Sequence, residues 1–462
     1  MKISIVLLFF PVASLAWQTT IFHWKEKVGD ILRNPFRRSR VPQFILDAGH
    51  PWVVENQRRL EKLPDAKSYI CIPPSESASD GGLGRAGNGE IGLDIPPDLF
   101  HYLEVNNGRF GVDRPGWPNA LVRLREIRDC PAAVSQATTF VVDIYAYRDG
   151  FDSPDKKILE PSQPPGEALD LFADILGNMT SLETLKWRIP SADAPYAEEH
   201  FLRRGLVLPS VDRLEPGAQS HFLVPMCPNI TALENGGGWE WLMRDSGDMD
   251  SELPLLQAAM LALKLKWFAM HTRGGWTKQM IQDLVSVYLP GIERLGLRGG
   301  LSRRDRYGDG ENSEGFALEV RKSNFRYTDD AHTLQETLRI LGTLQNLTYL
   351  ELPPAYQLNI GWDGGPGCGN AYDGPGGRRY ERQVVGQGAE AVDSAAALVL
   401  KALPRLIGFS IGSTQANITR YENGTREASF PWTGRKGEWV MEKVPLRPYE
   451  SDLDDDAGWD DL

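Results

Sequence analysis

The stretch Leu289-Pro290-Gly291-Ile292-Glu293-Arg294-Leu295-Gly296-Leu297 decides the fold of this 462-residue chain. It follows a predicted amphipathic helix over residues 277–288. Its pattern, L-P-x-I-x-x-L-x-L, alternates apolar and polar positions as a half-buried strand does. The same order of helix and short strand returns along the chain. Strands are predicted at 139–145, 182–187, 211–214, 230–233, 265–270, 292–297, 347–352 and 406–411.

This recurrence predicts an α/β repeat architecture. Helices are expected at 120–127, 168–176, 255–263, 277–288 and 395–403, and one more starts at the capping box Thr333-Leu334-Gln335-Glu336. One helix–strand pair cannot cover its own apolar face, so neighbouring pairs must stack. We therefore expect a solenoid with a parallel sheet on one face, helices on the other, and long inserted loops at 303–315 and 361–379.

Three segments resemble irregular leucine-rich repeats of the ribonuclease-inhibitor-like type. They are Leu289-Pro290-x-Ile292-x-x-Leu295-x-Leu297, Leu344-x-x-Leu347-x-x-Leu350-x-Leu352 and Leu403-Pro404-x-Leu406-x-x-Phe409-x-Ile411. The 29 residues from Leu185 to Leu214 and the 30 from Leu265 to Leu295 lie near the upper end of the usual repeat length, roughly 20–29 residues.

The repeats look most like those of fungal F-box/leucine-rich-repeat-like proteins, in which a helix ends in Cys-Pro or Leu-Pro before a short strand. Cys130-Pro131 and Cys227-Pro228 follow that habit. The resemblance covers residues 98–413. It implies a leucine-rich-repeat-like solenoid with a parallel sheet on a concave face and a binding role. No F-box-like segment is recognisable near the start of the sequence.

The N-terminus instead has the features of a secretory signal peptide over residues 1–16. Lys2 is followed by an apolar run over 3–10, and Ser14-Leu15-Ala16 provides small residues for cleavage after Ala16. The apolar run is shorter than the roughly 20 residues that a membrane span needs. We expect a helical cap and a Gly/Ser-rich loop over 17–97, the solenoid over 98–440, and an acidic disordered tail over 441–462.

Five Asn-x-Thr sequons agree with export and predict a glycoprotein. Their asparagines are Asn178, Asn229, Asn346, Asn417 and Asn423. Asn178, Asn229 and Asn346 border predicted strands, where asparagine also serves as a turn residue. Asn423 lies in a polar stretch and is the clearest acceptor.

The four cysteines allow three pairings. Cys130 and Cys227 stand just before predicted strands, at positions that favour small buried core residues. Cys71 and Cys368 lie in predicted loops and are the candidate disulfide in an oxidising compartment. No C-x-x-C or H-x-x-x-H spacing occurs, so no metal site is predicted.

The net charge of −12 disfavours a nucleic-acid partner, because phosphate binding needs a basic surface. Seven acids and no base occupy residues 450–462. Such a run repels itself and buries little surface. We therefore expect a solvated tail, with an acidic partner-binding tail as the alternative.

Three catalytic patterns were weighed. Gly408-Phe409-Ser410-Ile411-Gly412 matches a nucleophile elbow, but the last histidine, His332, precedes the serine, whereas the hydrolase fold needs it to follow. The dinucleotide-like run at 82–87 has neither the preceding strand nor the following helix that it requires. Glu240, Asp363 and Asp373 lie among aromatic residues and could serve a glycosidase, although turn-forming carboxylates explain them better.

These observations predict a secreted, non-enzymatic protein that binds a protein or glycan ligand and carries no cofactor. Aromatic residues in Gly-rich loops are the expected contacts. They are Trp239, Trp241, Trp362 and Tyr372. The alternatives are a secreted carbohydrate-active enzyme on a β-solenoid and an intracellular F-box-like adaptor. The sequence predicts neither a ligand identity nor an oligomeric state.

Overall fold

The computed structural model describes residues 41–63, 66–72, 95–106, 117–144, 163–235, 252–272, 274–301, 326–329, 331–363 and 374–447. The chain divides into two compact units, Met1–Pro96 and Pro97–Leu462. The predicted signal peptide and residues 448–462 lie outside the described ranges. No helix within those ranges is long and apolar enough to cross a membrane.

The first unit contains three short helices among its described residues: α2 (Gln43–Asp47), α3 (Pro51–Leu60) and α4 (Ala66–Ile70). The start of α3 follows from its sequence. The ring of His50 accepts a hydrogen bond from the backbone N–H of Trp52 at 3.2 Å, and Pro51 occupies the first turn, where a missing N–H costs nothing.

The second unit is built on one sheet of 11 strands, and the strands lie side by side in the order in which the chain forms them. Within this sheet, the nine strands that precede the final hairpin are joined by parallel pairing. They are β1 (Tyr102–Asn106), β2 (Thr139–Asp143), β3 (Thr184–Arg188), β4 (Arg213–Pro216), β5 (Ala232–Glu234), β6 (Trp267–His271), β7 (Arg294–Arg298), β9 (Tyr349–Leu352) and β11 (Gly408–Ile411). The predicted parallel sheet is therefore confirmed.

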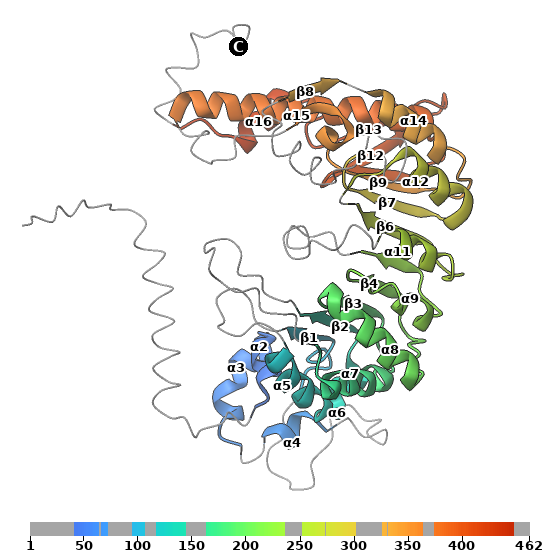
Figure 1. Ribbon diagram of the computed structural model, residues 1–462. Helices are drawn as coiled ribbons and strands as arrows, with labels where there is room; N and C mark the ends of the chain where they lie inside the picture. Colours follow the sequence, from blue (N-terminus) through green and yellow to red (C-terminus); the bar gives the residue numbers. More distant parts are fainter. Residues whose placement is uncertain are drawn as a thin grey trace, which may run out of the picture. The chain divides into compact units, whose positions relative to one another are not determined.

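Helical segments connect the strands and lie along one side of the sheet (Figure 1). They are α5 (Trp117–Arg128), α6 (Pro131–Gln136), α7 (Gly166–Asn178), η1 (Ser191–Asp193), α8 (Ala194–Arg204), α9 (Leu223–Met226), α11 (Glu252–Ala259), α12 (Lys278–Asp283), the π-helical turn η3 (Leu284–Tyr288), α14 (Ala331–Leu341), η4 (Ala355–Leu358) and α15 (Gly374–Ala402). This alternation of strand and helix is the α/β class predicted from the sequence.

The last part of the chain departs from the repeat. After β11 the chain turns back into the antiparallel strands β12 (Thr414–Arg420) and β13 (Arg426–Ser429), which end the sheet. Helix α16 (Lys436–Lys443) follows. A separate pair, β8 (Arg326–Asp329) with β10 (Ile360–Asp363), is antiparallel. None of these elements was predicted, because they lie outside the helix–strand recurrence.

The core lies between the sheet and its helices. The central inward residues of the strands stand in register: Leu103, Phe140, Leu185, Leu214, Leu233, Phe268, Leu295, Leu350 and Phe409. Most of these side chains are completely buried. Successive strands therefore present equivalent apolar side chains to the layer between the sheet and its helices.

Aromatic rings fill the first half of this core in an unbroken series. The ring of Phe172 on α7 lies 6.3 Å from Trp117 and 4.8 Å from Trp187, both edge-on. The series continues from Trp187 to Phe201 at 5.5 Å and from Phe201 to Phe222 at 6.3 Å. Edge-to-face pairs of this kind add to the stabilisation that burial alone provides.

Polar side chains just before three of the strands donate to backbone carbonyls just before the preceding strand in the sheet. The hydroxyl of Ser181 donates to the carbonyl of Ser135 at 2.9 Å. In the same way the amide of Asn229 donates to the carbonyl of Pro209 at 2.7 Å, and that of Asn346 to the carbonyl of Gly291 at 3.5 Å. These hydrogen bonds connect the turns that precede neighbouring strands.

Three sequence predictions need correction. Helix α14 starts at Ala331, so Thr333 lies inside the helix and the capping box is wrong. The residue in register with Leu295 is Phe268, not Leu265. Cys130 is not a free core thiol: it precedes the short helix α6 and is disulfide-bonded, as Cys71 is. The predicted partner of Cys71, Cys368, lies outside the described residues.

Candidate functional site

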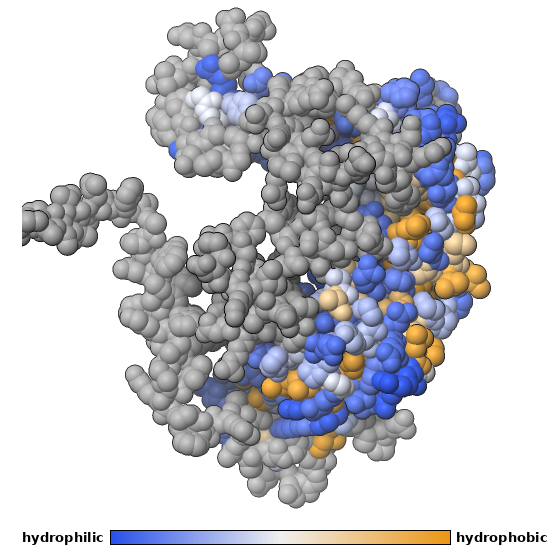
Figure 2. Space-filling model, in the orientation of Figure 1, coloured by the Kyte–Doolittle hydropathy of each residue, from blue (hydrophilic) through white to orange (hydrophobic). Residues whose placement is uncertain are grey.

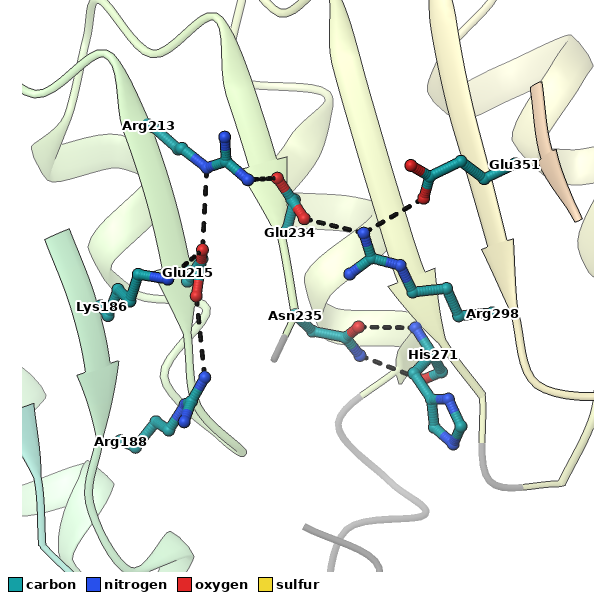
Figure 3. A network of polar contacts seen from close by, with 9 residues as sticks. All are labelled: Lys186, Arg188, Arg213, Glu215, Glu234, Asn235, His271, Arg298 and Glu351. Atoms are coloured by element: carbon teal, nitrogen blue, oxygen red, sulfur yellow. Dashed lines mark hydrogen bonds and ion pairs between the residues drawn. The ribbon is translucent and has the colours of Figure 1, made fainter. Parts of the chain in front are cut away.

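The described helices that connect the strands lie along one face of the sheet (Figure 1), and we call the other face the open face. Because side chains alternate along a strand, each strand of the central region places its polar positions on the open face. Strands β3 to β9 carry five cationic and three anionic side chains there: Lys186, Arg188, Arg213, Arg294 and Arg298, with Glu215, Glu234 and Glu351. The parallel register aligns these residues in rows across the sheet, and Figure 3 shows all of them except Arg294.

Glu215 on β4 is the first centre of this charged network. Its carboxylate lies 2.9 Å from the Lys186 ammonium and 3.7 Å from a guanidinium nitrogen of Arg188. Arg213, on the same strand, approaches it at 3.7 Å. The Glu215 side chain is only 9% exposed. Three cations therefore compensate one nearly buried carboxylate.

Glu234 on β5 is the second centre. Arg213 donates to one of its oxygens, and Arg298 from β7 donates to the other at 2.9 Å. Arg298 also donates to Glu351 on β9 at 3.1 Å. One arginine thus joins strands from both sides of β6 (Figure 3).

The small size of Gly296 and the raised pKa of Arg298 both affect this part of the network. A Cβ atom at Gly296 would lie 2.7 Å from the Cβ of Ala269 and 3.1 Å from Glu351, so glycine leaves the space through which the charged side chains meet. Burial acts to lower the pKa of Arg298, but Glu234 and Glu351 outweigh it and raise that pKa above its usual value. Arg298 stays cationic at any physiological pH.

His271, at the end of β6, borders the network (Figure 3). Its backbone N–H donates to the side-chain oxygen of Asn235 at 2.6 Å, and its carbonyl accepts from the same amide at 3.0 Å. Burial and then the nearby Arg298 lower the pKa of its imidazole. The ring is therefore neutral near pH 7, and the network gains no further charge from it.

Arg294, at the start of β7, differs from the other cations. Its guanidinium carbon lies 4.8 Å from the ring centre of Trp267 and 4.9 Å from that of Tyr349. Register explains the arrangement, since Arg294 is paired with Trp267 on one neighbouring strand and Tyr349 on the other. Among the described residues it has no carboxylate partner.

Of the four residues predicted as ligand contacts, only Trp362 lies within the described part of the chain. Trp239, Trp241 and Tyr372 lie outside the described residues, as do Glu240, Asp373 and the glycine-rich run at 82–87. Trp362 and Asp363 belong to strand β10. The open-face charges were missed because each appears in the sequence only as a polar position in a short strand. The charged residues stand at every second position of their strands, and this spacing could have predicted that they share one face of the sheet.

The serine of the elbow-like motif is part of the sheet. Ser410 lies within β11, paired with Glu351 on one side and Gln415 on the other. The chain then continues into another strand, whereas a nucleophile elbow needs a turn into a helix. The described residues also contain no group of three His, Cys, Asp or Glu side chains placed to hold a metal ion.

A cavity of about 860 Å³ lies between α15 and the β12–β13 hairpin. Among the described groups that line it, the buried Nε of Arg426 has no hydrogen-bond partner, whereas Trp432 and Lys436 are paired. The indole of Trp432 donates to Asp393 at 2.9 Å, and Lys436 lies 3.4 Å from the same carboxylate.

The sequon asparagines differ in their surroundings. Asn417 and Asn423 are exposed on the β12–β13 hairpin. Asn178 and Asn346 are also exposed, but their amides donate to backbone carbonyls. Asn229 is half-buried, and its side-chain oxygen also accepts from Lys264 at 2.7 Å.

The side opposite the open face carries scattered apolar residues. Leu202, Val207, Leu261 and Leu263 are each more than half exposed. In Figure 2, hydrophobic residues form separate orange groups with hydrophilic residues between them. Apolar residues exposed singly are ordinary for a protein surface, so they mark no site by themselves.

Comparison with known proteins adds no assignment: no protein-family model matches the chain, and no curated protein matches its sequence.

Proposed function

We propose that this chain is a secreted, non-enzymatic binding protein with a leucine-rich-repeat-like solenoid, and that it holds a protein ligand on the open face of its sheet. The sequential parallel sheet supports the solenoid, because each strand neighbours only the strands before and after it. Nearest-neighbour stacking of this kind is the organisation of repeat proteins, which use extended surfaces for binding.

The surplus of hydrogen-bond donors on the open face carries the proposal. The carboxylates of Glu215 and Glu234 are nearly buried, and each is surrounded by cations. The guanidinium groups around them have more N–H donors than these carboxylates accept. A ligand that supplies acceptors and negative charge therefore complements the face.

The residue types favour a protein ligand over a glycan. Arginine, tryptophan and tyrosine dominate the energetics of protein interfaces, and Arg294, Trp267 and Tyr349 form one cluster on this face. The open face carries five cations and three carboxylates, so a neutral glycan would leave its net positive charge without a counterpart.

Secretion is supported by Cys71 and Cys130, which are both disulfide-bonded, since disulfides persist chiefly in oxidising compartments. Expression in a secretory eukaryotic host tests this part. We expect the protein in the medium, starting at Trp17 and losing mass when glycans are removed. Retention in the cytosol with Met1 intact would favour the adaptor alternative.

A binding screen with two bulky variants tests the proposed face. The full-length protein is screened against purified extracellular domains and immobilised glycans. Thr184→Tyr places a large uncharged side chain on the open face, at a half-exposed strand position. Val122→Tyr places the same side chain on α5, where the valine is 54% exposed.

We expect a protein ligand whose binding Thr184→Tyr weakens at least tenfold and Val122→Tyr leaves unchanged. Equal sensitivity to both variants, or sensitivity to Val122→Tyr alone, would contradict the open-face proposal. Binding to glycans alone would replace the protein ligand with a carbohydrate.

A further inference from the structure

Arg294 is the open-face cation whose hydrogen-bonding capacity is unused. Arg188 and Arg298 lie within 4 Å of carboxylates, and so do Lys186 and Arg213. The guanidinium of Arg294 makes no ion pair or side-chain hydrogen bond within the described part of the chain. Arg294 is also exposed.

The two aromatic rings hold this guanidinium without consuming its donors. The ring centres of Trp267 and Tyr349 are 6.1 Å apart, and the guanidinium carbon lies 4.8 and 4.9 Å from them. In that triangle both rings lie to one side of the guanidinium. Contact with ring faces uses the π-surface of the cation, so its N–H groups remain available on the other side.

This support also reduces the cost of binding. A free arginine side chain loses rotamer freedom when it is immobilised at an interface. Trp267 is only 9% exposed and is fixed in the sheet, so Arg294 rests on a rigid platform. Its planar fork of donors matches the two oxygens of a carboxylate in a bidentate pair.

The surroundings select a singly charged anion. Glu351 follows Tyr349 by two residues and lies on the same face, and the neighbouring carboxylate of Glu234 shares Arg298 with it. A doubly charged phosphate would meet stronger repulsion from these groups than a carboxylate would.

We propose that Arg294, supported by Trp267 and Tyr349, is a binding site for a carboxylate, supplied by an acidic peptide segment of the ligand protein. The proposal rests on the proposed function for the source of the peptide. The carboxylate site itself rests on the geometry of these three residues.

A fluorescein-labelled deca-glutamate peptide provides the probe, with deca-glutamine as the uncharged control. Fluorescence anisotropy is measured with the full-length protein, Arg294→Gln and Arg294→Lys, at about 50 and 150 mM salt. The matched control is Arg339→Gln, which removes the same charge from an exposed position on helix α14.

We expect deca-glutamate but not deca-glutamine to bind, and Arg294→Gln to weaken binding about tenfold. Arg294→Lys retains the charge but not the bidentate fork, so most of the loss should remain. Arg339→Gln should bind like the unmodified protein. Absence of deca-glutamate binding, or equal losses for Arg294→Gln and Arg339→Gln, would overturn the proposal.

The two proposals fail separately. A protein ligand that is sensitive to Thr184→Tyr, together with no Arg294-dependent peptide binding, would remove only the carboxylate site. Arg294-dependent peptide binding without any open-face protein ligand would remove the proposed function and leave the site.

Discussion

Substitution Glu234→Gln tests whether the charged network stabilises the sheet. The glutamine retains the shape of the side chain and one acceptor but loses the charge. Glu234 is 6% exposed and accepts from Arg213 and Arg298, which are 46% and 32% exposed. A hydrogen bond to a charged partner is worth roughly 1 kcal/mol more than a neutral one.

Two such bonds weaken in this variant, and the solvent exposure of Arg213 reduces its share. Arg298 keeps its contact with Glu351. We therefore expect the free energy of unfolding to fall by about 2 kcal/mol.

Urea unfolding followed by circular dichroism measures this loss, with Glu293→Gln as the control. Glu293 lies 3.7 Å from Lys266, and both side chains are about half exposed, so its substitution should cost less than about 0.5 kcal/mol. A double-mutant cycle with Arg298→Gln should give a coupling of about 1 kcal/mol. If Glu234→Gln destabilises the protein no more than Glu293→Gln does, the network does not stabilise the sheet.

Three further outcomes are expected. Phe172→Ala removes a fully buried ring between Trp117 and Trp187 and should lower the free energy of unfolding by about 3–5 kcal/mol in the same urea assay; a loss below about 1 kcal/mol would contradict the packing described. Glycopeptide mapping after secretion should find glycan on the exposed hairpin residue Asn423 and none on the half-buried Asn229; the reverse occupancy would show that the link between repeats is dispensable. Burial raises the pKa of the Cys227 thiol to about 12, so iodoacetamide at pH 8 should label Cys227 only in denaturant. The stability that the neutral thiol contributes should be lost as pH rises from about 9 toward 12. Rapid labelling of Cys227 in the native protein would contradict this expectation.

The strand positions were predictable because each repeat carries the same alternation. Leu185, Leu214 and Leu350 stand in the register that the sequence indicates. The run over 265–270 was placed wrongly because it is apolar at nearly every position, so alternation cannot decide which side chains face inward. Trp267 faces the open side of the sheet, where the Tyr349 ring and the Arg294 guanidinium cover it, and Phe268 therefore faces inward.

The charged network was not predictable as a site, because its members come from five different strands. Lys186 and Glu351 are 165 residues apart in the sequence, and only the parallel register places them in the same row. From the sequence alone, Glu215 and Glu234 would be expected to face solvent. In the structure they are nearly buried, because cations from neighbouring strands compensate their charges.

The first residue of helix α14 was also predicted wrongly, for a different reason. Thr333 and Glu336 have the spacing of a capping box, but residues 331 and 332 already belong to the helix. The local sequence pattern predicted the helix correctly but placed its start too late, so that its first residues were left out. The disulfide at Cys130 was missed for a related reason, since the Cys-Pro pattern suggested a buried thiol and carried no information about a partner far away in the sequence.

The central claim is that the open face of the sheet binds the ligand. Site-specific photo-crosslinking tests it most directly, with p-benzoylphenylalanine placed at position 184 on the open face or at position 122 on α5, in the presence of a ligand recovered in the screen. We expect a crosslinked complex from position 184 and none from position 122. Crosslinking from position 122 alone would show that the ligand binds the helical side and would contradict the claim.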